Sequence, residues 1–341
     1  MLSLCVVIGA LLGAAADMPA EPYHIVVAPV GQDNPRNSEA AIVPLKDGTL
    51  LLGWTEFYAG DAADHGPARI SAKISADTGR TWGEKFTLIE NDGGCNVMEV
   101  NFLRLKDGKL ALFYCQKNSE SADCRVMMRT SSDDGKTWGT AKLISPEGRY
   151  TGLTNGRCIR LASGRILLEA WEGGFSYCYL SDDEGETWRE SQRLKPGDGS
   201  WEPAAIELKD GRVLMLMRTQ LGGQYQSLSS DGGETWTEPV ASALVGTAAP
   251  VSISRIPTTG DLLAIWNHNP GASSRNPLTA AISKDEGATW ERFRNIEDGP
   301  GDAWAYPAVT WVNGQALLTY FNYTGGLSLQ LKILPATWFY E

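Results

Sequence analysis

The chain has 341 residues, of which 43% are hydrophobic and 21% charged, and its formal net charge is −11. This composition is that of a folded globular protein and excludes a disordered chain, while the acidic balance argues against a nucleic-acid partner, because phosphate binding needs a basic surface. Only 3 histidines are present, which argues against a histidine-rich metal centre, and beyond the N-terminus no apolar run reaches the ~20 residues that a membrane-spanning helix needs.

The N-terminal segment 1–16 consists almost entirely of apolar and small residues and ends in three alanines before Asp17. This pattern resembles the apolar core and cleavage site of a secretory signal, although the usual preceding positive charge is missing. We therefore expect a secreted or periplasmic protein, with a short buried strand as the alternative reading of this segment.

The cysteine count does not define a disulfide framework. Removal of a signal segment would take Cys5 and leave an odd number of cysteines, namely Cys95, Cys115, Cys124, Cys158 and Cys178. Bridges between Cys115 and Cys124 or between Cys158 and Cys178 are open, and so are free buried thiols.

After a first apolar strand at 23–28, the chain repeats a simple pattern of apolar strand, short turn and apolar strand. In the first copy, at 41–52, the turn is Asp47-Gly48. Asp-Gly and Asn-Gly turns between apolar alternations are typical of β-hairpins. The equivalent turn glycines predict six units: Gly48, Gly108, Gly164, Gly211, Gly260 and Gly314.

An octapeptide, Ser-x-Asp-x-Gly-x-Thr-Trp, alternates with these hairpins. It occurs at 75–82, 131–138, 181–188, 229–236 and 283–290. We interpret it as a tight turn in which the Asp side chain bonds backbone amides, the Gly takes a positive φ and the Trp packs inward.

Each unit therefore has two strands around the first turn and two around the octapeptide, or four strands per ~50 residues. Six such sheets around an axis make an all-β, six-bladed β-propeller with four antiparallel strands per blade. The sixth unit lacks the octapeptide and ends with a strand at 327–334, so strand 23–28 is predicted to supply its outer strand and close the ring. We expect one domain over 23–341.

The innermost strands of a propeller bring equivalent positions to one axial pocket. Counting back nine residues from the turn glycine gives Glu39, Glu99, Asn155 and Glu202, and counting back eight in the shorter turn of blade six gives Tyr306. Charged residues are rarely buried unless paired, so these positions favour a binding or catalytic site over core packing. The alternative is that these side chains lie on the rim of the propeller and do not form a site.

Two arginines are expected close to this pocket. Arg218 follows Gly211 by seven residues, on the strand beside Glu202, and Arg275 precedes the strand that leads into the fifth octapeptide. Planar guanidinium groups suit a carboxylate, so the pair predicts binding of an anion. Pairing of each arginine with a neighbouring glutamate is the alternative.

At this point the octapeptide resembles the Asp-box of the bacterial neuraminidase-repeat proteins, the sialidase superfamily, and the resemblance extends from about residue 23 to the end. It implies a tyrosine nucleophile with a glutamate base, an aspartate general acid on a blade-one loop, three arginines around the substrate carboxylate, and no metal or cofactor. A neutral nucleophile suits sialic acid, because the carboxylate on its anomeric carbon repels an anionic one.

Carried over residue by residue, the resemblance makes Tyr306 the nucleophile, on a strand followed across a hairpin by Tyr320, and Glu202 its base. Asp64 resembles the general acid, and Asp61 is the near alternative. For each aspartate, the competing interpretation is a solvated turn residue without a catalytic role.

The same carry-over makes Arg218 and Arg275 the second and third arginines. The first arginine departs from the pattern, because Ser38 and then Glu39 stand where the family has an Arg-Ile-Pro motif. Arg36, two residues earlier and in a different register, is the remaining candidate for binding substrate, whereas the Arg-Ile-Pro at Arg255 lies at the far end of its strand. A glutamate beside the expected clamp would repel sialic acid, so the sequence predicts a different substrate, either another acidic sugar or a neutral one.

The resulting prediction is an exo-acting, retaining glycoside hydrolase of sialidase type, with a glycan or glycoconjugate substrate. A sialidase-like hydrolase of a different glycan is one alternative, motivated by Glu39 and Glu99. A non-catalytic propeller that binds glycan or protein is another, with sugar faces stacked on tryptophans. The tryptophans near pocket-facing strands are Trp54, Trp171, Trp266 and Trp304.

Overall fold

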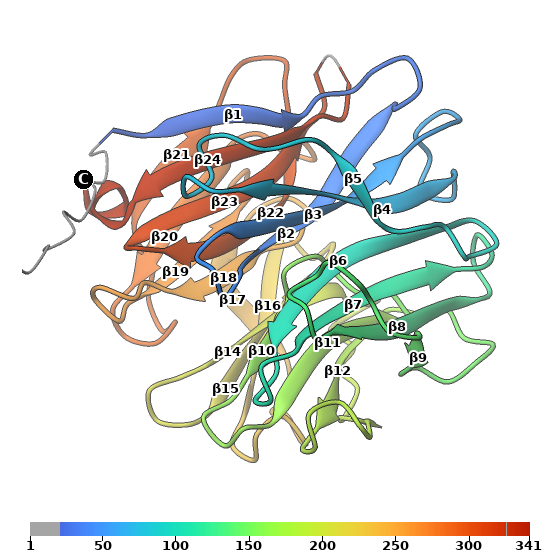
Figure 1. The fold of residues 1–341 in the computed structure, drawn as a ribbon. Coiled ribbons are helices and arrows are strands. Elements are labelled where there is room, and N and C mark those ends of the chain that lie inside the picture. The colour runs from blue at the N-terminus through green and yellow to red at the C-terminus, as the bar shows by residue number, and fades with distance from the viewer. Residues whose placement is uncertain (1–20, 325) are drawn as a thin grey trace, which may run out of the picture.

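The computed structural model describes residues 21–324 and 326–341, so the expected signal segment 1–16 lies outside the described residues. The described strands form six four-stranded antiparallel sheets arranged around an axis (Figure 1). The predicted six-bladed β-propeller is therefore confirmed.

The blades follow one another in chain order, and the first strand of each blade is the innermost. Blades one to three contain β2 (Arg36–Pro44), β3 (Leu50–Phe57), β4 (Ala68–Ser75), β5 (Phe86–Ile89), β6 (Asn96–Arg104), β7 (Leu110–Lys117), β8 (Cys124–Ser131), β9 (Lys142–Leu143), β10 (Cys158–Arg160), β11 (Ile166–Glu172), β12 (Phe175–Ser181) and β13 (Arg189–Glu190). Blades four to six contain β14 (Trp201–Glu207), β15 (Val213–Arg218), β16 (Gly223–Ser229), β17 (Val240–Val245), β18 (Ser252–Arg255), β19 (Leu262–Trp266), β20 (Leu278–Ser283), β21 (Glu291–Glu297), β22 (Trp304–Val312), β23 (Gln315–Asn322), β24 (Leu329–Pro335) and β1 (Tyr23–Ala28).

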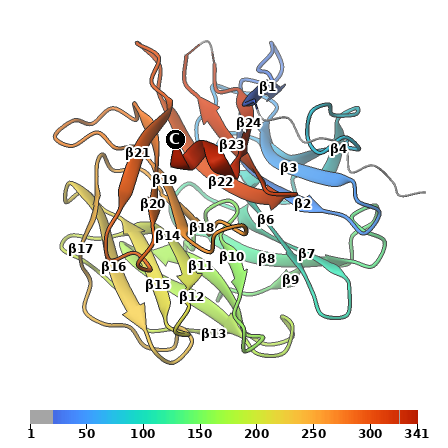
Figure 2. The same cartoon turned by 90° about the vertical axis from the view of Figure 1, so that its left-hand side faces the viewer.

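Blade six is completed by the two ends of the described chain. β1 pairs antiparallel with β24, with Tyr23 opposite Ile333 (Figure 1). The predicted closure by strand 23–28 is confirmed, and the last strand begins two residues later than expected. A 3-10 helix, η1 (Ala336–Tyr340), follows β24 and packs against β20, β21 and β24 (Figure 2).

The hydrophobic core lies between neighbouring blades. In one cluster, Leu51 and Ile70 of blade one pack against Val97 and Leu112 of blade two, and all four side chains are buried. Alternating apolar residues on the central strands supply both faces of each sheet, so every blade contributes to two such clusters.

The octapeptide forms the turn between the third and fourth strands of five blades. In the first copy, Asp77 accepts hydrogen bonds from the Thr81 backbone N–H (2.8 Å) and from the Thr81 hydroxyl (2.6 Å). Gly79 has a φ of +94°, and the Trp82 indole donates to its carbonyl at 3.0 Å. The interpretation of the motif as a tight turn is confirmed.

At the octapeptide, a repeated ion pair within one blade forms hydrogen bonds to the backbone of the neighbouring blade. Glu286 of blade five pairs with Arg255 at 2.8 Å and accepts a hydrogen bond from the Lys209 backbone N–H of blade four at 2.8 Å. Arg255 also donates to the Glu207 carbonyl of blade four at 2.9 Å. The Arg-Ile-Pro arginine is therefore a structural residue, as its register predicted. The same arrangement recurs at Arg104–Asp134 with Lys46 and at Arg160–Glu184 with Lys106.

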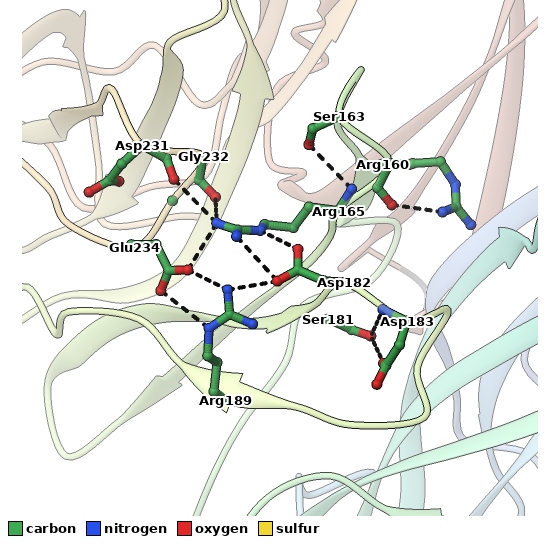
Figure 3. A network of polar contacts seen from close by, with 12 residues as sticks. Arg160, Ser163, Arg165, Ser181, Asp182, Asp183, Arg189, Asp231, Gly232 and Glu234 are labelled. Atoms are coloured by element: carbon green, nitrogen blue, oxygen red, sulfur yellow. Dashed lines mark hydrogen bonds and ion pairs between the residues drawn. The ribbon is translucent and has the colours of Figure 1, made fainter.

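The interface between blades three and four carries a different network of charged side chains (Figure 3). Arg165 bonds Asp182 of its own blade at 2.6 Å and the Gly232 carbonyl of the next octapeptide at 3.1 Å. Arg189 bridges Asp182 and Glu234. Charged contacts therefore link the outer turns of these two blades as well.

Replacing Glu286 with Gln should lower the free energy of unfolding by about 1–3 kcal/mol, because charge-assisted hydrogen bonds across the blade interface are lost. The bonds from Arg255 hold the pKa of Glu286 at about 2. Since this pKa is depressed, the stabilisation is fully present above the ordinary value of 4.5 and is lost as the pH falls towards 2.

Urea denaturation of the parent and the Glu286→Gln variant at pH 7 and pH 3 measures this effect. Glu291→Gln is the matched control, because Glu291 pairs with Lys284 and both side chains are about half exposed. A Glu286 variant as stable as the parent at pH 7 would contradict the assignment.

Candidate active site

Four inner strands carry the same local distortion, and it aims their side chains at the axis. Glu39, Glu99, Glu202 and Tyr306 have φ values of +45°, +66°, +48° and +57°. Each lies where the register of its strand with the next strand shifts, which marks a β-bulge. A bulge re-aims a side chain, so the equivalence predicted by counting from the turn glycines is confirmed.

The bulges on β14 and β22 bring a phenol and a carboxylate together. The Tyr306 hydroxyl donates to Glu202 Oε1 at 2.6 Å, and Arg218 donates to Glu202 Oε2 at 2.5 Å. Burial raises the pKa of Tyr306 well above its ordinary value, and the Glu202 charge adds to the effect. The phenol is therefore protonated at neutral pH and has a base already in contact with it.

Arg275 approaches the same phenol from blade five. Its guanidinium carbon lies 5.6 Å from the centre of the Tyr306 ring, and its one hydrogen bond to a described side chain goes to the Tyr323 hydroxyl at 2.7 Å. The Tyr306 ring also stacks on Phe321, with 5.5 Å between ring centres. The remaining guanidinium N–H groups are available to a ligand.

Arg36 also reaches the cavity, although its register in the sequence argued against this. The bulge after Ser38 lets Arg36 on β2 donate to Glu39 at 2.5 Å and to the Asp64 carboxylate. The expectation that Glu39 would repel a carboxylate did not include these contacts: Arg36 pairs with the Glu39 carboxylate, and the Ser38 hydroxyl donates a hydrogen bond to it at 2.5 Å.

Asp64 lies at the mouth of the cavity, on the loop between β3 and β4. Its side chain is 71% exposed. Partial burial favours the neutral acid, but the neighbouring Arg36 outweighs it and lowers the pKa of Asp64. The near alternative, Asp61, is exposed, accepts a hydrogen bond from the Ala63 backbone N–H at 3.1 Å and does not line the cavity.

These residues enclose one cavity of about 450 Å³ at one end of the axis. It is lined by Arg36, Glu39, Asp64, Glu99, Glu202, Arg218, Arg275 and Tyr306. The structure therefore brings the three candidate arginines and the nucleophile, base and acid candidates to one place.

Several other candidates are not part of this cavity. Asn155 is fully buried, and its amide donates to the carbonyls of Ala40 (2.7 Å) and Tyr306 (3.3 Å), so it holds the inner strands together. Tyr320 is buried between blades and bonds Glu297. Of the four tryptophans considered, Trp171 alone lines the cavity; the others are buried: Trp54, Trp266 and Trp304.

Sequence reasoning missed a group of cavity residues on blades two and three. Lys117, at the end of β7, is 3% exposed and lines the cavity together with Tyr150, Cys115 and Cys124. Both cysteines are free thiols, as are the other three in the described residues. The one available signal was a lysine at the end of a strand that is apolar up to Cys115.

Within the described residues, neither a cluster of metal-binding side chains nor a membrane-spanning helix is found. In the described ranges, no group of three or more histidine, cysteine, aspartate or glutamate side chains is arranged to hold a metal ion. A search of the same residues finds no helix with the length and apolar character needed to cross a membrane.

Comparison with known proteins agrees with this fold. Residues 48–318 match the BNR repeat-like domain. The chain is 26% identical over 335 residues to a sialidase of Micromonospora viridifaciens, a match that covers 85% of this chain and 51% of the relative. It is 27% identical over 244 residues to a sialidase of Paraclostridium sordellii, a match that covers 60% of this chain and 59% of the relative.

Solved structures show the same architecture at low sequence identity. The NanB sialidase of Streptococcus pneumoniae superposes with a TM-score of 0.74 at 16% identity, over 91% of this chain and 70% of that one. A protein of unknown function from Dyadobacter fermentans superposes with a TM-score of 0.76 at 19% identity, over 93% of this chain and 99% of that one.

The fold and the axial cavity define a six-bladed propeller of the sialidase superfamily. The chain belongs to the family of BNR repeat-like domain proteins, which its match over 48–318 establishes. It spans about half the length of the curated sialidases that it matches, at 51%, 38% and 59% of the first three.

The wall of the cavity at blade three depends on a glycine. A Cβ atom at Gly152 would overlap the Trp171 ring, which lines the cavity. We expect Gly152→Ala to displace that ring and to lower the free energy of unfolding by about 1–3 kcal/mol, the usual cost of overpacking. Urea denaturation measures the loss, and tryptophan fluorescence should report the displaced ring.

Gly31→Ala is the control for this substitution, because a Cβ atom there would meet nothing within 4 Å. Equal stability of the two variants would show that Trp171 is free to move.

Proposed function

We propose that the protein is an exo-acting glycoside hydrolase that removes a terminal acidic sugar from a glycan with retention of configuration. The hydrogen bond of 2.6 Å between Tyr306 and Glu202 carries this proposal, since it joins a protonated phenol to a carboxylate base inside a cavity that also holds arginines. The sialidases among the relatives support it.

Charge favours an acidic over a neutral sugar. Arg36, Arg218 and Arg275 line the cavity, and Arg275 has no carboxylate partner within 4 Å among the described residues. Guanidinium groups bind carboxylates through paired hydrogen bonds. A carboxylate on the anomeric carbon would lie against these arginines and next to Tyr306.

In the first step Glu202 accepts the Tyr306 proton as the phenol oxygen bonds the anomeric carbon. The glycosidic bond breaks, and Asp64 donates a proton to the leaving oxygen. In the second step Asp64 accepts a proton from water as the water oxygen bonds the anomeric carbon. The bond to Tyr306 breaks, and Glu202 returns the proton to the phenol oxygen.

Replacing Tyr306 with Phe should abolish hydrolysis of a fluorogenic aryl sialoside, because the nucleophilic oxygen is removed while the ring remains packed on Phe321. Tyr320→Phe is the matched control, a buried tyrosine outside the cavity whose loss should spare activity. Equal rates for Tyr306→Phe and the parent would exclude Tyr306 as nucleophile. Inactivity of all three proteins would point to a different sugar.

Asp64 must be protonated to act as the acid, so the pKa lowered by Arg36 predicts a fall of kcat/KM as the pH rises above that low value. A bound substrate carboxylate neutralises part of the Arg36 charge and raises the pKa of Asp64. The falling limb of kcat should therefore lie at higher pH than that of kcat/KM.

Profiles of both constants between pH 3 and pH 8 measure the two limbs. Asp64→Asn should lose both limbs together with about 10²–10⁴-fold in kcat, the usual contribution of a general acid. Asp61→Asn is its control. If kcat and kcat/KM of the parent protein fell at the same pH, the coupling of Asp64 to the bound substrate through Arg36 would be contradicted.

We further propose that the protein acts outside the cytoplasm, which the apolar segment 1–16 supports.

A further inference from the structure

The blade-two side of the cavity holds two polar groups that the proposed reaction does not use. Lys117 ends β7 and Glu99 occupies the bulge of β6, and these side chains, together with Tyr150, form what we call the blade-two subsite. Lys117 and Glu99 are 3% and 7% exposed, so both are almost wholly withdrawn from solvent while lining the cavity.

Lys117 is buried and forms no ion pair among the described residues, although its charge acts at longer range on the Asp64 carboxylate. Its Nζ donates to the Asp64 backbone carbonyl at 3.0 Å and lies 5.4 Å from the centre of the Tyr150 ring. No carboxylate of the described residues lies within 4 Å of this Nζ, in contrast to the ion pairs of Arg36 and Arg218. Burying an ammonium group without a counter-ion is costly, so the site is suited to an incoming anion.

Glu99 does not fill that role. Among the described residues its carboxyl group has no hydrogen-bond partner, and Oε2 is fully enclosed. Burial, together with the neighbouring Glu39 carboxylate, raises the pKa of Glu99 well above its ordinary value. The raised pKa favours the neutral form of Glu99, which has an O–H to donate and would not oppose an anion in the cavity.

The two cations without carboxylate partners project from opposite blades of the ring. Lys117 belongs to blade two, whereas Arg275 precedes β20 of blade five. A single carboxylate held against Arg275 and Tyr306 leaves the Lys117 charge unmatched across the cavity. A ligand with two anionic groups would match both.

We propose that the blade-two subsite binds a second acidic group of the substrate, so that the preferred substrate is a glycoside of a sugar with two carboxylates. This inference rests on the proposed function, because it places the first carboxylate at the arginines. Lys117 would supply the charge, and Glu99 would donate a hydrogen bond to the same group.

Calorimetric titration with two non-hydrolysable probes tests this proposal. The first probe is the phenyl α-thioglycoside of N-acetylneuraminic acid. The second is the same compound with its side chain cleaved by periodate and oxidised to a carboxylic acid at C7. The wild-type protein should bind the diacid about tenfold or more tightly than the monoacid, the effect of one added charge-assisted hydrogen bond.

Lys117→Met should remove this preference, whereas Lys117→Arg should keep it. Lys109→Met is the matched control, since Lys109 lies in the turn between β6 and β7, does not line the cavity and has its side chain 49% exposed. The wild-type comparison needs no variant to fold. Equal affinity for the two probes, binding of neither, or equal weakening of both by Lys117→Met would overturn the subsite.

Turnover is measured separately with the corresponding aryl O-glycosides. Tight binding of the diacid thioglycoside without hydrolysis of either O-glycoside would overturn the proposed hydrolase function and leave the subsite standing. Hydrolysis of the monoacid O-glycoside by a protein that binds both thioglycosides equally well would support the hydrolase function and overturn the subsite.

Discussion

The left-handed backbone at four inner-strand positions is the constraint on which the cavity depends. In a regular strand these side chains would alternate between the two faces of a blade, and three glutamates and a phenol would enter the apolar clusters between blades. The bulge turns each of them to the axis instead. Non-glycine residues adopt this conformation at a cost of about 1–2 kcal/mol, and the surrounding blades must hold it in place.

The cavity balances acidic and basic groups through specific pairs. Arg36 pairs with Glu39, and Arg218 and Tyr306 bond Glu202, whereas the raised pKa of Glu99 favours its neutral form. An acidic protein can thereby present a cavity suited to an anionic ligand, because the charges near the axis are set locally. The outer turns carry ion pairs of their own that link blade to blade.

The repeats made the fold predictable from sequence, since the turn glycines and the octapeptide each mark one position in every blade. Counting from those glycines also identified the bulge residues. Counting placed Arg36 in the wrong register, because it assumed a regular strand where β2 has a bulge, and Arg36 nevertheless lines the cavity as one of the candidate residues. It overrated Asn155, which precedes the short strand β10 and bonds carbonyls. Lys117 is the counterpart of the apolar Phe57 of blade one, so the repeat itself did not mark it as a cavity residue.

Closure of the ring by β1 and β24 makes the fold dependent on both ends of the described chain. Residues about three hundred positions apart must pair before blade six is complete, so a ribosome has to release nearly the whole polypeptide before the propeller can form. A prematurely terminated product would expose the unpaired edges of β1 and β23, which are templates for aggregation. Biosynthesis of this architecture therefore favours delayed folding.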